Sequence, residues 1–290
     1  MTTTLSSYLT IARNFARYQK MVAAEPATKT ASDYYAANIG KVKSIGDFVS
    51  DYRLLSYALK SYGLSDHISD KALITKVLQG GVDSAKALAN KLSDPRWRAF
   101  ARAFDFIGKG AASVSTDLSI SATKNGYVEN KLEVEQGESN AGVQLALYFI
   151  RVAPTASSAY SIIGDKNLLQ VVQTIFRLPA ISGSTDIDQQ AKVISKLMPI
   201  DNLKDPAKLE KLTERFAAMY DLTYGPGSGG SGLSAVGYGP LQTSAAAGVL
   251  QGVIQANGET LSKVLSTGAP KPIISDQLMT QLQRLSMAGL

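Results

Sequence analysis

Hydrophobic positions recur at helical spacing along most of this chain. The stretch from Asp51 to Leu64 reads DYRLLSYALKSYGL, and one helical face carries its apolar residues, which are Leu54, Leu55, Ala58, Leu59 and Tyr62. Asp51 is placed as an N-cap, Gly63 as a left-handed C-cap, and Leu64 as a residue that folds back onto the helix end. The stretch therefore predicts a short amphipathic helix with both of its ends marked.

Other segments show the same combination of caps and apolar faces. An amphipathic helix is predicted from Leu5 to Val22, closed by Pro26, and another is predicted to start at an N-cap, Ser32. Further short helices are predicted within residues 70–78, 84–92 and 94–106. The last of these has Pro95 at its first position and an apolar stripe formed by Trp97, Phe100, Ala101 and Phe104. We therefore expect an all-α protein.

Residues 107–146 interrupt the helical pattern. Val114–Ile120 and Lys131–Glu135 alternate between apolar and polar residues, as strands do, and Asn125 and Gly126 lie between them. The Asn-Gly dipeptide favours a tight hairpin turn. We predict an inter-repeat segment that carries a small β-hairpin.

The pattern of the first half returns in the second half. The stretch DKNLLQVVQTIFRL, from Asp165 to Leu178, matches the opening stretch at an offset of 114 residues, and the offset becomes 116 after a two-residue insertion. Matched pairs are Tyr34 with Tyr148, Ser44 with Ser158, Asp51 with Asp165, Leu64 with Leu178, Asp70 with Asp186 and Phe100 with Phe216. Colinear caps and apolar positions favour an internal duplication over a chance likeness between two sets of amphipathic helices.

The expected architecture is two copies of a short-helix bundle unit with helical terminal extensions. The predicted divisions are an N-terminal amphipathic helix (1–32), helical repeat 1 (33–106), the inter-repeat segment (107–146), helical repeat 2 (147–222), a Gly/Ser-rich linker (223–240) and C-terminal helices (241–290).

Composition narrows the classes of function. The chain has no cysteine, which excludes disulfides, zinc-thiolate sites and cysteine nucleophiles. A net charge of +6 without a concentrated basic block is weak evidence for nucleic-acid binding. The N-terminal MTTTLSSY has no basic residue before its apolar positions, so a Sec signal peptide is not expected, and no apolar run is long enough to span a bilayer.

Two candidate sites have simpler interpretations. Gly225, Gly227 and Gly230 match a GxGxxG spacing, but they follow a predicted helix within a Gly/Ser run, whereas a dinucleotide site needs a strand before that turn. His67, the only histidine, lies beside Asp66 in a predicted turn, where a solvated residue is the simpler interpretation than a catalytic base.

The carboxylates and the arginine-rich helix are interpreted in the same way. Glu133 and Glu135 would share one face of the predicted hairpin and could reach a metal with Glu129 or Glu138, but a solvated face explains them. A predicted helix could track phosphates through three arginines and offer one aromatic ring for stacking, the residues being Arg96, Arg98, Arg102 and Trp97. Because Trp97 shares the apolar stripe, burial explains it better, and nucleic-acid binding is disfavoured. No catalytic, cofactor or metal site is predicted, and an enzyme is the least supported class.

The two ends of the chain carry the predicted interaction surface. Both the first helix and a helix predicted within residues 241–265 are amphipathic and lie outside the repeats, so each apolar stripe must be buried against something. They would pair with each other, cover the core or contact another subunit. The residues assigned to a surface for another subunit are Leu9, Phe15, Val253 and Leu261.

A set of short motifs resembles a known family. The motifs are Tyr34-Tyr35, Ser44, Asp47-Phe48, Asp51–Leu55, Ala58, Tyr62–Leu64, Lys76–Leu78, Ala87–Asp94 and Arg102–Phe106. They resemble an alphaproteobacterial family of unknown function, DUF1217, whose genes often lie in flagellar clusters and whose members often carry duplicated units. The resemblance is dense across residues 33–106, diluted across 147–222 and absent from both termini, and it brings no catalytic residues to transfer.

The resemblance implies a non-enzymatic structural or assembly protein of the bacterial flagellum. Proteins of the flagellar axis are exported without a cleaved signal peptide, contain little cysteine, begin with a Ser/Thr-rich segment and often pack their terminal helices together. The implied partners are flagellar components or further copies of this chain, and the implied route is the flagellar type III export system. Two alternatives stay open: a cytoplasmic flagellar chaperone or regulator, and a nucleic-acid-binding protein.

Overall fold

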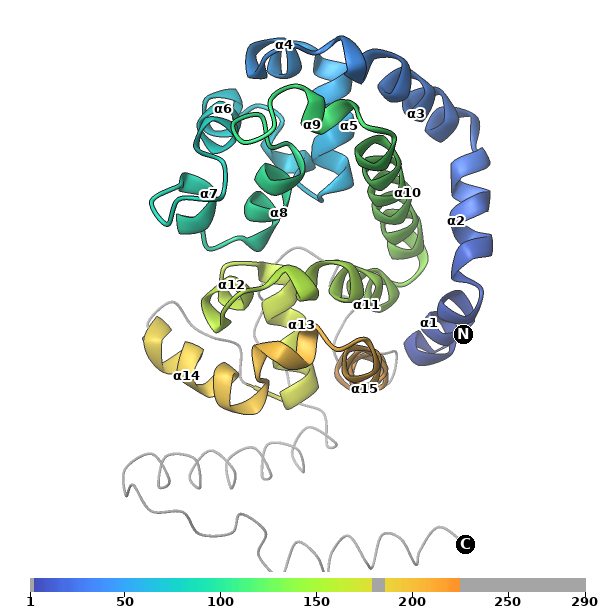
Figure 1. Ribbon diagram of the computed structural model, residues 1–290. Coiled ribbons are helices and arrows are strands. Elements are labelled where there is room, and N and C mark those ends of the chain that lie inside the picture. Colours follow the sequence, from blue (N-terminus) through green and yellow to red (C-terminus); the bar gives the residue numbers. More distant parts are fainter. Residues whose placement is uncertain (1–2, 179–185, 225–290) are drawn as a thin grey trace, which may run out of the picture. The chain divides into compact units, whose positions relative to one another are not determined.

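The structure is a computed structural model that describes residues 3–178 and 186–224. Within this part of the chain all regular elements are helices, which confirms the all-α expectation (Figure 1). The described residues belong to one compact unit, which spans Met1–Tyr238. The predicted glycine-rich linker and C-terminal helices, with Gly225, Gly227, Gly230, Val253 and Leu261, lie outside the described residues.

The first group of helices precedes a long helix, α10. Its elements are α1 (Thr4–Arg13), α2 (Phe15–Ala24), α3 (Pro26–Asn38), η1 (Ile39–Lys41), α4 (Ile45–Ser50), α5 (Tyr52–Ser61), η2 (Ser65–His67), α6 (Lys71–Gly80), α7 (Leu88–Lys91), α8 (Pro95–Ala103) and α9 (Ala112–Ser115). The long helix α10 runs from Asp117 to Ser139.

The second group of helices follows α10. Its elements are α11 (Ala141–Val152), η3 (Ala153–Thr155), α12 (Ala159–Ile163), α13 (Lys166–Phe176), α14 (Ile187–Leu197), η4 (Ile200–Leu203) and α15 (Pro206–Tyr224). In Figure 1, α1 lies beside α11 and α15, which come much later in the sequence. The N-terminal helix is thus part of the second group in space.

Two hydrophobic clusters form the core. The first is built from α3 to α9 and contains Phe48, Trp97, Phe100 and Phe104, so the predicted stripe of α8 is buried as expected. The second is built mainly from α11 to α15 and also receives side chains of α1, α2 and α10. Burial of these side chains supplies the main driving force for the fold.

The predicted β-hairpin is wrong, because its residues lie in helices: Val114 and Ser115 end α9, and residues 117–135 belong to α10. The apolar residues of α10 face two sides: Ile120 and Tyr127 pack against the first cluster, whereas Val128 and Leu132 belong to the second. A helix buried on two sides lacks a single apolar stripe, so its sequence does not show the usual helical period. Gly126 serves a close approach of helices instead of a turn, since a Cβ there would lie 2.9 Å from the carbonyl oxygen of Ser61 in α5.

The N-terminal segment also differs from the prediction. The helix expected from Leu5 to Val22 is broken at Asn14 into α1 and α2. Pro26 starts the next helix at its first position, where its missing N–H costs nothing, rather than closing the previous one. Ser32 is not an N-cap: it is buried in the middle of α3, and its hydroxyl forms a 2.8 Å hydrogen bond with the hydroxyl of Tyr57.

The same order of elements occurs in both groups. The series α3, η1, α4, α5 corresponds to α11, η3, α12, α13, and the N-caps of the last two helices in each series are Ser44 and Asp51 in the first and Ser158 and Asp165 in the second. Asp70 and Asp186 stand at the N-cap positions of α6 and α14, but only the side chain of Asp186 accepts a hydrogen bond from its helix. This correspondence supports the duplication, which stays our interpretation of the sequence.

The residues that end α5 and α13 share a left-handed backbone conformation but differ in type. Gly63 has φ of 71° after α5, and the amide of Leu64 donates to the carbonyl of Leu59 at 2.8 Å, so the predicted C-cap is confirmed. At the matching position after α13 stands Arg177, with φ of 52°. A side chain in this left-handed region is strained, so the second copy keeps the turn at an energetic cost.

Candidate functional site

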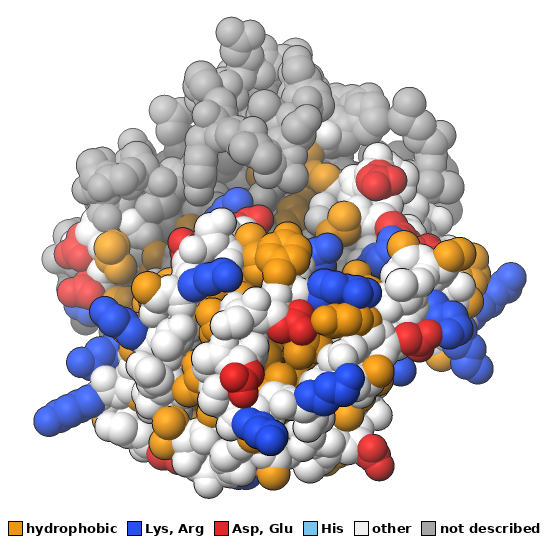
Figure 2. All heavy atoms as spheres, turned by 90° about the horizontal axis from the view of Figure 1, so that it is seen from above, with side chains coloured by type: hydrophobic (Ala, Val, Ile, Leu, Met, Phe, Trp, Pro, Cys, Tyr) orange, Lys and Arg blue, Asp and Glu red, His pale blue; other side chains and the backbone are white. Residues whose placement is uncertain are grey.

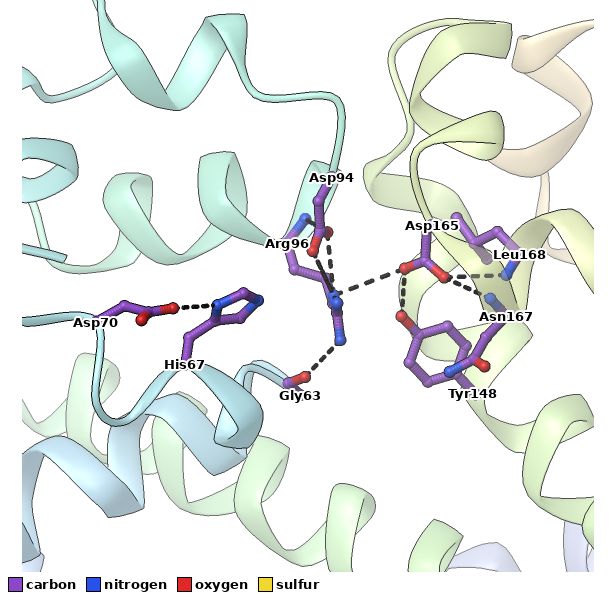
Figure 3. Close-up of polar contacts among 9 residues, drawn as sticks. All are labelled: Gly63, His67, Asp70, Asp94, Arg96, Tyr148, Asp165, Asn167 and Leu168. Atoms are coloured by element: carbon purple, nitrogen blue, oxygen red, sulfur yellow. Dashed lines mark hydrogen bonds and ion pairs between the residues drawn. The ribbon is translucent and has the colours of Figure 1, made fainter. Parts of the chain in front are cut away.

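Buried charged side chains meet where the two helical groups contact each other. We call Asp94, Arg96, Tyr148 and Asp165 the junction network (Figure 3). Asp94 is the N-cap of α8, and Arg96 lies in the first turn of that helix, held there by the Asp-Pro start. Asp165 is the N-cap of α13, and Tyr148 comes from α11. The network therefore joins the start of a helix in the first group to the start of a helix in the second.

Arg96 is the centre of the network. Its Nε donates to both carboxylate oxygens of Asp94 at 3.0 Å, and its Nη2 lies 2.7 Å from Asp94 Oδ2. Its Nη1 donates to the carbonyl of Gly63, at the end of α5. Its Nε also lies 3.6 Å from Asp165 Oδ2, so this guanidinium connects two carboxylates and a helix C-terminus.

Asp165 satisfies three donors at once. One oxygen accepts from the amides of Asn167 and Leu168 at 2.9 and 3.0 Å, and the other accepts from the hydroxyl of Tyr148. The side chain of Asp165 is only 1% exposed. A carboxylate so deeply buried is stable only when its charge is compensated, and Arg96 supplies that compensation.

The pKa shifts of Arg96 and Tyr148 agree with this arrangement. Burial acts against the charge of Arg96, but its hydrogen bonds to Asp94 and the neighbouring negative charges outweigh burial, so the pKa of the guanidinium is raised above its ordinary value. Burial raises the pKa of Tyr148, and the charge of Asp165 raises it further. The phenol therefore stays protonated and donates to Asp165.

A second buried ion pair lies close to the first. Arg151 of α11 donates from Nε and Nη2 to the two oxygens of Glu133 in α10, at 2.5 and 2.8 Å. Burial acts to lower the pKa of Arg151, and Glu133 outweighs it, so that pKa is raised. A Cβ added to Gly63 would lie 3.4 Å from Arg151 Nη2, which places this pair beside the same helix end that Arg96 contacts.

His67 has a partner other than the one considered from the sequence. Its Nδ1 lies 2.8 Å from Asp70 Oδ2, and its ring centroid lies 5.0 Å from that of Trp97 (Figure 3). Asp70 also precedes α6. His67 thus lies in the connection between α5 and α6, as predicted, and its ring contacts Asp70 and Trp97.

The glutamates considered as metal ligands bind other groups. Glu133 pairs with Arg151, Glu135 pairs with Lys131, and Glu129 accepts from the side chain of Gln19 at 3.0 Å. In residues 3–178 and 186–224 no group of three His, Cys, Asp or Glu side chains is placed to hold a metal ion. Within the same residues no helix has the length and apolar character that a membrane span requires.

The helix considered for phosphate tracking does not present its residues together. Trp97 is 3% exposed, so its ring cannot stack on a nucleotide base. Arg96 is held in the junction network, Arg98 is partly buried, and Arg102 is exposed. The structure thus separates three arginines that the sequence places on one short helix.

Leu9 and Phe15 are partly buried against the second cluster. The helix α1 packs on α15 and α11, and the backbone amide of Thr4 donates to both carboxylate oxygens of Asp221 at 3.0 and 2.8 Å. Contacts within the chain therefore already cover part of the Leu9 and Phe15 side chains. The assignment of these two residues to a surface for another subunit stays a prediction.

Sequence comparison identifies the family. The model of the family described as "Protein of unknown function (DUF1217)" matches residues 61–209, just over half of the chain. This chain belongs to the DUF1217 family. A crystal structure of a protein from Agrobacterium tumefaciens, determined as a structural genomics target, is 42% identical to this DUF1217 protein. It matches with a TM-score of 0.70 over 76% of this chain and 94% of that one. A search of curated proteins found no match.

The junction network lies inside the DUF1217 match. Asp94, Arg96, Tyr148 and Asp165 all fall within residues 61–209, whereas Tyr34 and Asp51, their counterparts at the start of the chain, do not. The internal repeat aligns Tyr34 with Tyr148 and Asp51 with Asp165, but the alignment does not pair a tyrosine with an aspartate. The sequence does contain a signal for this contact, since each tyrosine precedes its aspartate by the same 17 residues. In the structure each tyrosine hydroxyl donates to that aspartate.

Proposed function

We propose that this DUF1217 protein is a non-enzymatic structural or assembly component associated with the bacterial flagellum. In this proposal it is exported without a cleaved signal peptide and packs against flagellar components through the helices at its two ends. The flagellar part rests on the genomic setting that the family resemblance implies. The assembly part rests on the placement of the N-terminal helix.

That placement brings both ends of the described chain together. Thr4 is bound to Asp221, and α1 packs along α15, which ends at Tyr224 where the C-terminal segment begins. A Cβ on Gly142 would lie 2.4 Å from the ring of Tyr220 and 2.8 Å from Thr4, so α11 seats both helices closely. One partner could therefore contact the N-terminal helix and the start of the C-terminal segment together, which suits a subunit that assembles through its ends.

One face of the described surface has a mixed character (Figure 2). On the face shown in Figure 2, hydrophobic side chains are interspersed with Lys, Arg, Asp and Glu side chains. Surfaces of that kind are ordinary for folded proteins and do not by themselves indicate a partner. The proposal accordingly places the contact at the chain ends.

Flagellar fractionation tests the assembly proposal. The tagged chain would be followed in purified basal bodies from cells that carry the wild type, the double variant Leu9→Ser with Phe15→Ser, or the control Leu118→Ser. Leu118 is 81% exposed on α10, so its substitution removes a surface leucine away from the chain ends. The double variant is expected to reduce recovery about tenfold, the effect of losing roughly 1.4 kcal/mol of binding.

Two results would contradict the proposal. The first is absence of the wild type from basal bodies, which would exclude the flagellar assignment. The second is recovery of a folded double variant in the same amount as Leu118→Ser, which would exclude the chain ends as the contact surface. Thermal unfolding of each purified variant shows whether it is folded at the temperature of the experiment.

A cytoplasmic flagellar chaperone is the second candidate, and a groove favours it. The groove, of about 450 Å³, lies between α3, α5 and α10 and includes Tyr34, Tyr57, Tyr127 and the 62% exposed Tyr52. Arg53 and Lys60 also line it, and no lining residue is acidic, so it suits an extended acidic segment with apolar side chains in an unassembled flagellar subunit. Under this alternative the chain stays in the cytosol, and Lys60→Glu weakens capture of that subunit.

A further inference from the structure

A cavity lies next to the junction network and is not used by it. Its volume is about 500 Å³, and it is bounded by α7 and α8 on one side and by η3 and α12 on the other. Pro95, between Asp94 and Arg96, and Ser93 form part of its wall. This volume lies within the range of small-molecule sites, about 300–1,000 Å³.

The charged residues of this cavity have one sign. Lys91 and Arg98 line it, and no Asp or Glu does. Two aspartates that adjoin or contact lining residues have other partners: Asp94 binds Arg96, and Asp188 accepts from the hydroxyl of Tyr160 at 2.8 Å. The charged side chains that line the cavity are thus both cations, which favours an anion.

One nitrogen of the Arg98 guanidinium has no partner within the described chain. Its Nε is buried and has no hydrogen-bond partner among the described residues, and no ion pair of Arg98 or Lys91 occurs in that part of the chain. Removing part of a guanidinium from water without pairing it raises the free energy of the protein. Arg96, only two residues earlier, shows the usual solution, which is a carboxylate at hydrogen-bond distance.

Polar groups of the opposite wall are weakly engaged. The hydroxyl of Ser161 lies 3.4 Å from the hydroxyls of Ser157 and Ser158, near the limit of a hydrogen bond, and Ser158 Oγ accepts from the amide of Ser161 at the same distance. On the α7 side, Asn90 donates its amide to the carbonyls of Val82 and Ser84. The cavity thus offers several hydroxyl groups beside two cations.

We infer that this cavity binds a small molecule that carries a phosphate group. Lys91 and Arg98 hold the phosphate, and the serine hydroxyls donate to its remaining oxygens. A phosphate has more acceptor oxygens than a carboxylate, which matches two cations and several hydroxyls that approach from two walls. The inference stands independently of the proposed flagellar function.

Calorimetric titration of the full-length chain tests this inference. The probes are inorganic phosphate and glycerol 3-phosphate, each in a buffer whose ionic strength is matched with sodium chloride, so that general salt effects cancel. Arg98→Gln and Lys91→Gln remove the two cations of the cavity. Arg102→Gln and Lys86→Gln are the matched controls, because both residues are exposed and neither lines the cavity.

Each result supports or overturns the inference. Arg98→Gln and Lys91→Gln are expected to weaken binding about tenfold, the effect of one charge-assisted hydrogen bond, whereas the controls change it less than about twofold. Because Arg98 is partly buried, Lys91→Gln, at an exposed position, decides the matter if Arg98→Gln does not fold. Binding of glycerol 3-phosphate alone assigns an ester, and equal binding of both probes assigns the phosphate group itself. Absence of binding, or equal losses in cavity and control variants, overturns the inference.

Discussion

Two aspartates in matching positions separate the effect of a helix cap from that of the junction network. Asp51 and Asp165 each accept from two backbone amides at 2.9 and 3.0 Å, and each accepts from a tyrosine hydroxyl. Asp51 is half-buried, whereas Asp165 is buried with Arg96 beside it. Substitution by asparagine keeps an N-cap of similar quality and removes the charge.

The expected effects differ severalfold. Asp51→Asn should change the free energy of unfolding by less than about 0.5 kcal/mol, because asparagine caps helices as well as aspartate. For Asp165, two unit charges 3.6 Å apart attract by about 5 kcal/mol at an effective dielectric constant of about 20. Desolvation of the carboxylate offsets part of this attraction, so Asp165→Asn should lose about 2–3 kcal/mol.

Urea unfolding of both variants and the wild type gives the comparison. Far-UV circular dichroism reports the helices, and the fluorescence of Trp97, the single tryptophan, reports the neighbourhood of Arg96. Coincident transitions by the two probes justify a two-state treatment. If Asp165→Asn loses no more than Asp51→Asn, the assignment of the junction network as an electrostatic connection between the two groups is refuted.

Three further predictions concern the helix crossings, the C-caps and the tyrosines. Gly126→Ala should lower the free energy of unfolding by about 1–3 kcal/mol, since its Cβ would lie 2.9 Å from the carbonyl oxygen of Ser61; an unchanged urea midpoint would contradict the close crossing. Arg177 and Gly63 both have positive φ, which glycine adopts without strain. In the same assay Arg177→Gly should therefore stabilise the protein by about 0.5–1 kcal/mol, and Gly63→Ala should destabilise it by at least about 1 kcal/mol. Changes in unfolding free energy of the same sign for both variants would refute the left-handed cap. Burial raises the pKa of Tyr62 from 10.0 to about 12, so its contribution to stability is complete below pH 10 and is lost as the pH rises towards 12. Thermal unfolding across this range should show a decline that is smaller in Tyr62→Phe, and identical profiles would contradict it.

Local features of the fold could be predicted from the sequence because their causes lie close together in the chain. Asp51, Gly63 and Leu64 mark both ends of α5, and the structure places all three as expected. The failure at α10 has the opposite cause. Its apolar residues are distributed between two cores that exist only after folding, and the role of Gly126 depends on Ser61 of another helix.

The junction network could not be predicted for a related reason. Arg96 and Asp165 belong to different helical groups, and only the packing of those groups brings them to 3.6 Å. From the sequence alone, Arg96 resembles an exposed neighbour of Arg98 and Arg102. Its Asp-Pro-Trp context indicates a helix start, but it contains no information about the buried carboxylate of the second group.

The most direct test of the assembly proposal is where the protein goes. The tagged chain would be assayed in culture medium, purified basal bodies and cytosol, in cells with and without a working flagellar export gate. The account predicts that it appears in the medium or the basal body only when the gate works. A chain that stays in the cytosol in both strains would contradict the account and would favour the cytoplasmic chaperone.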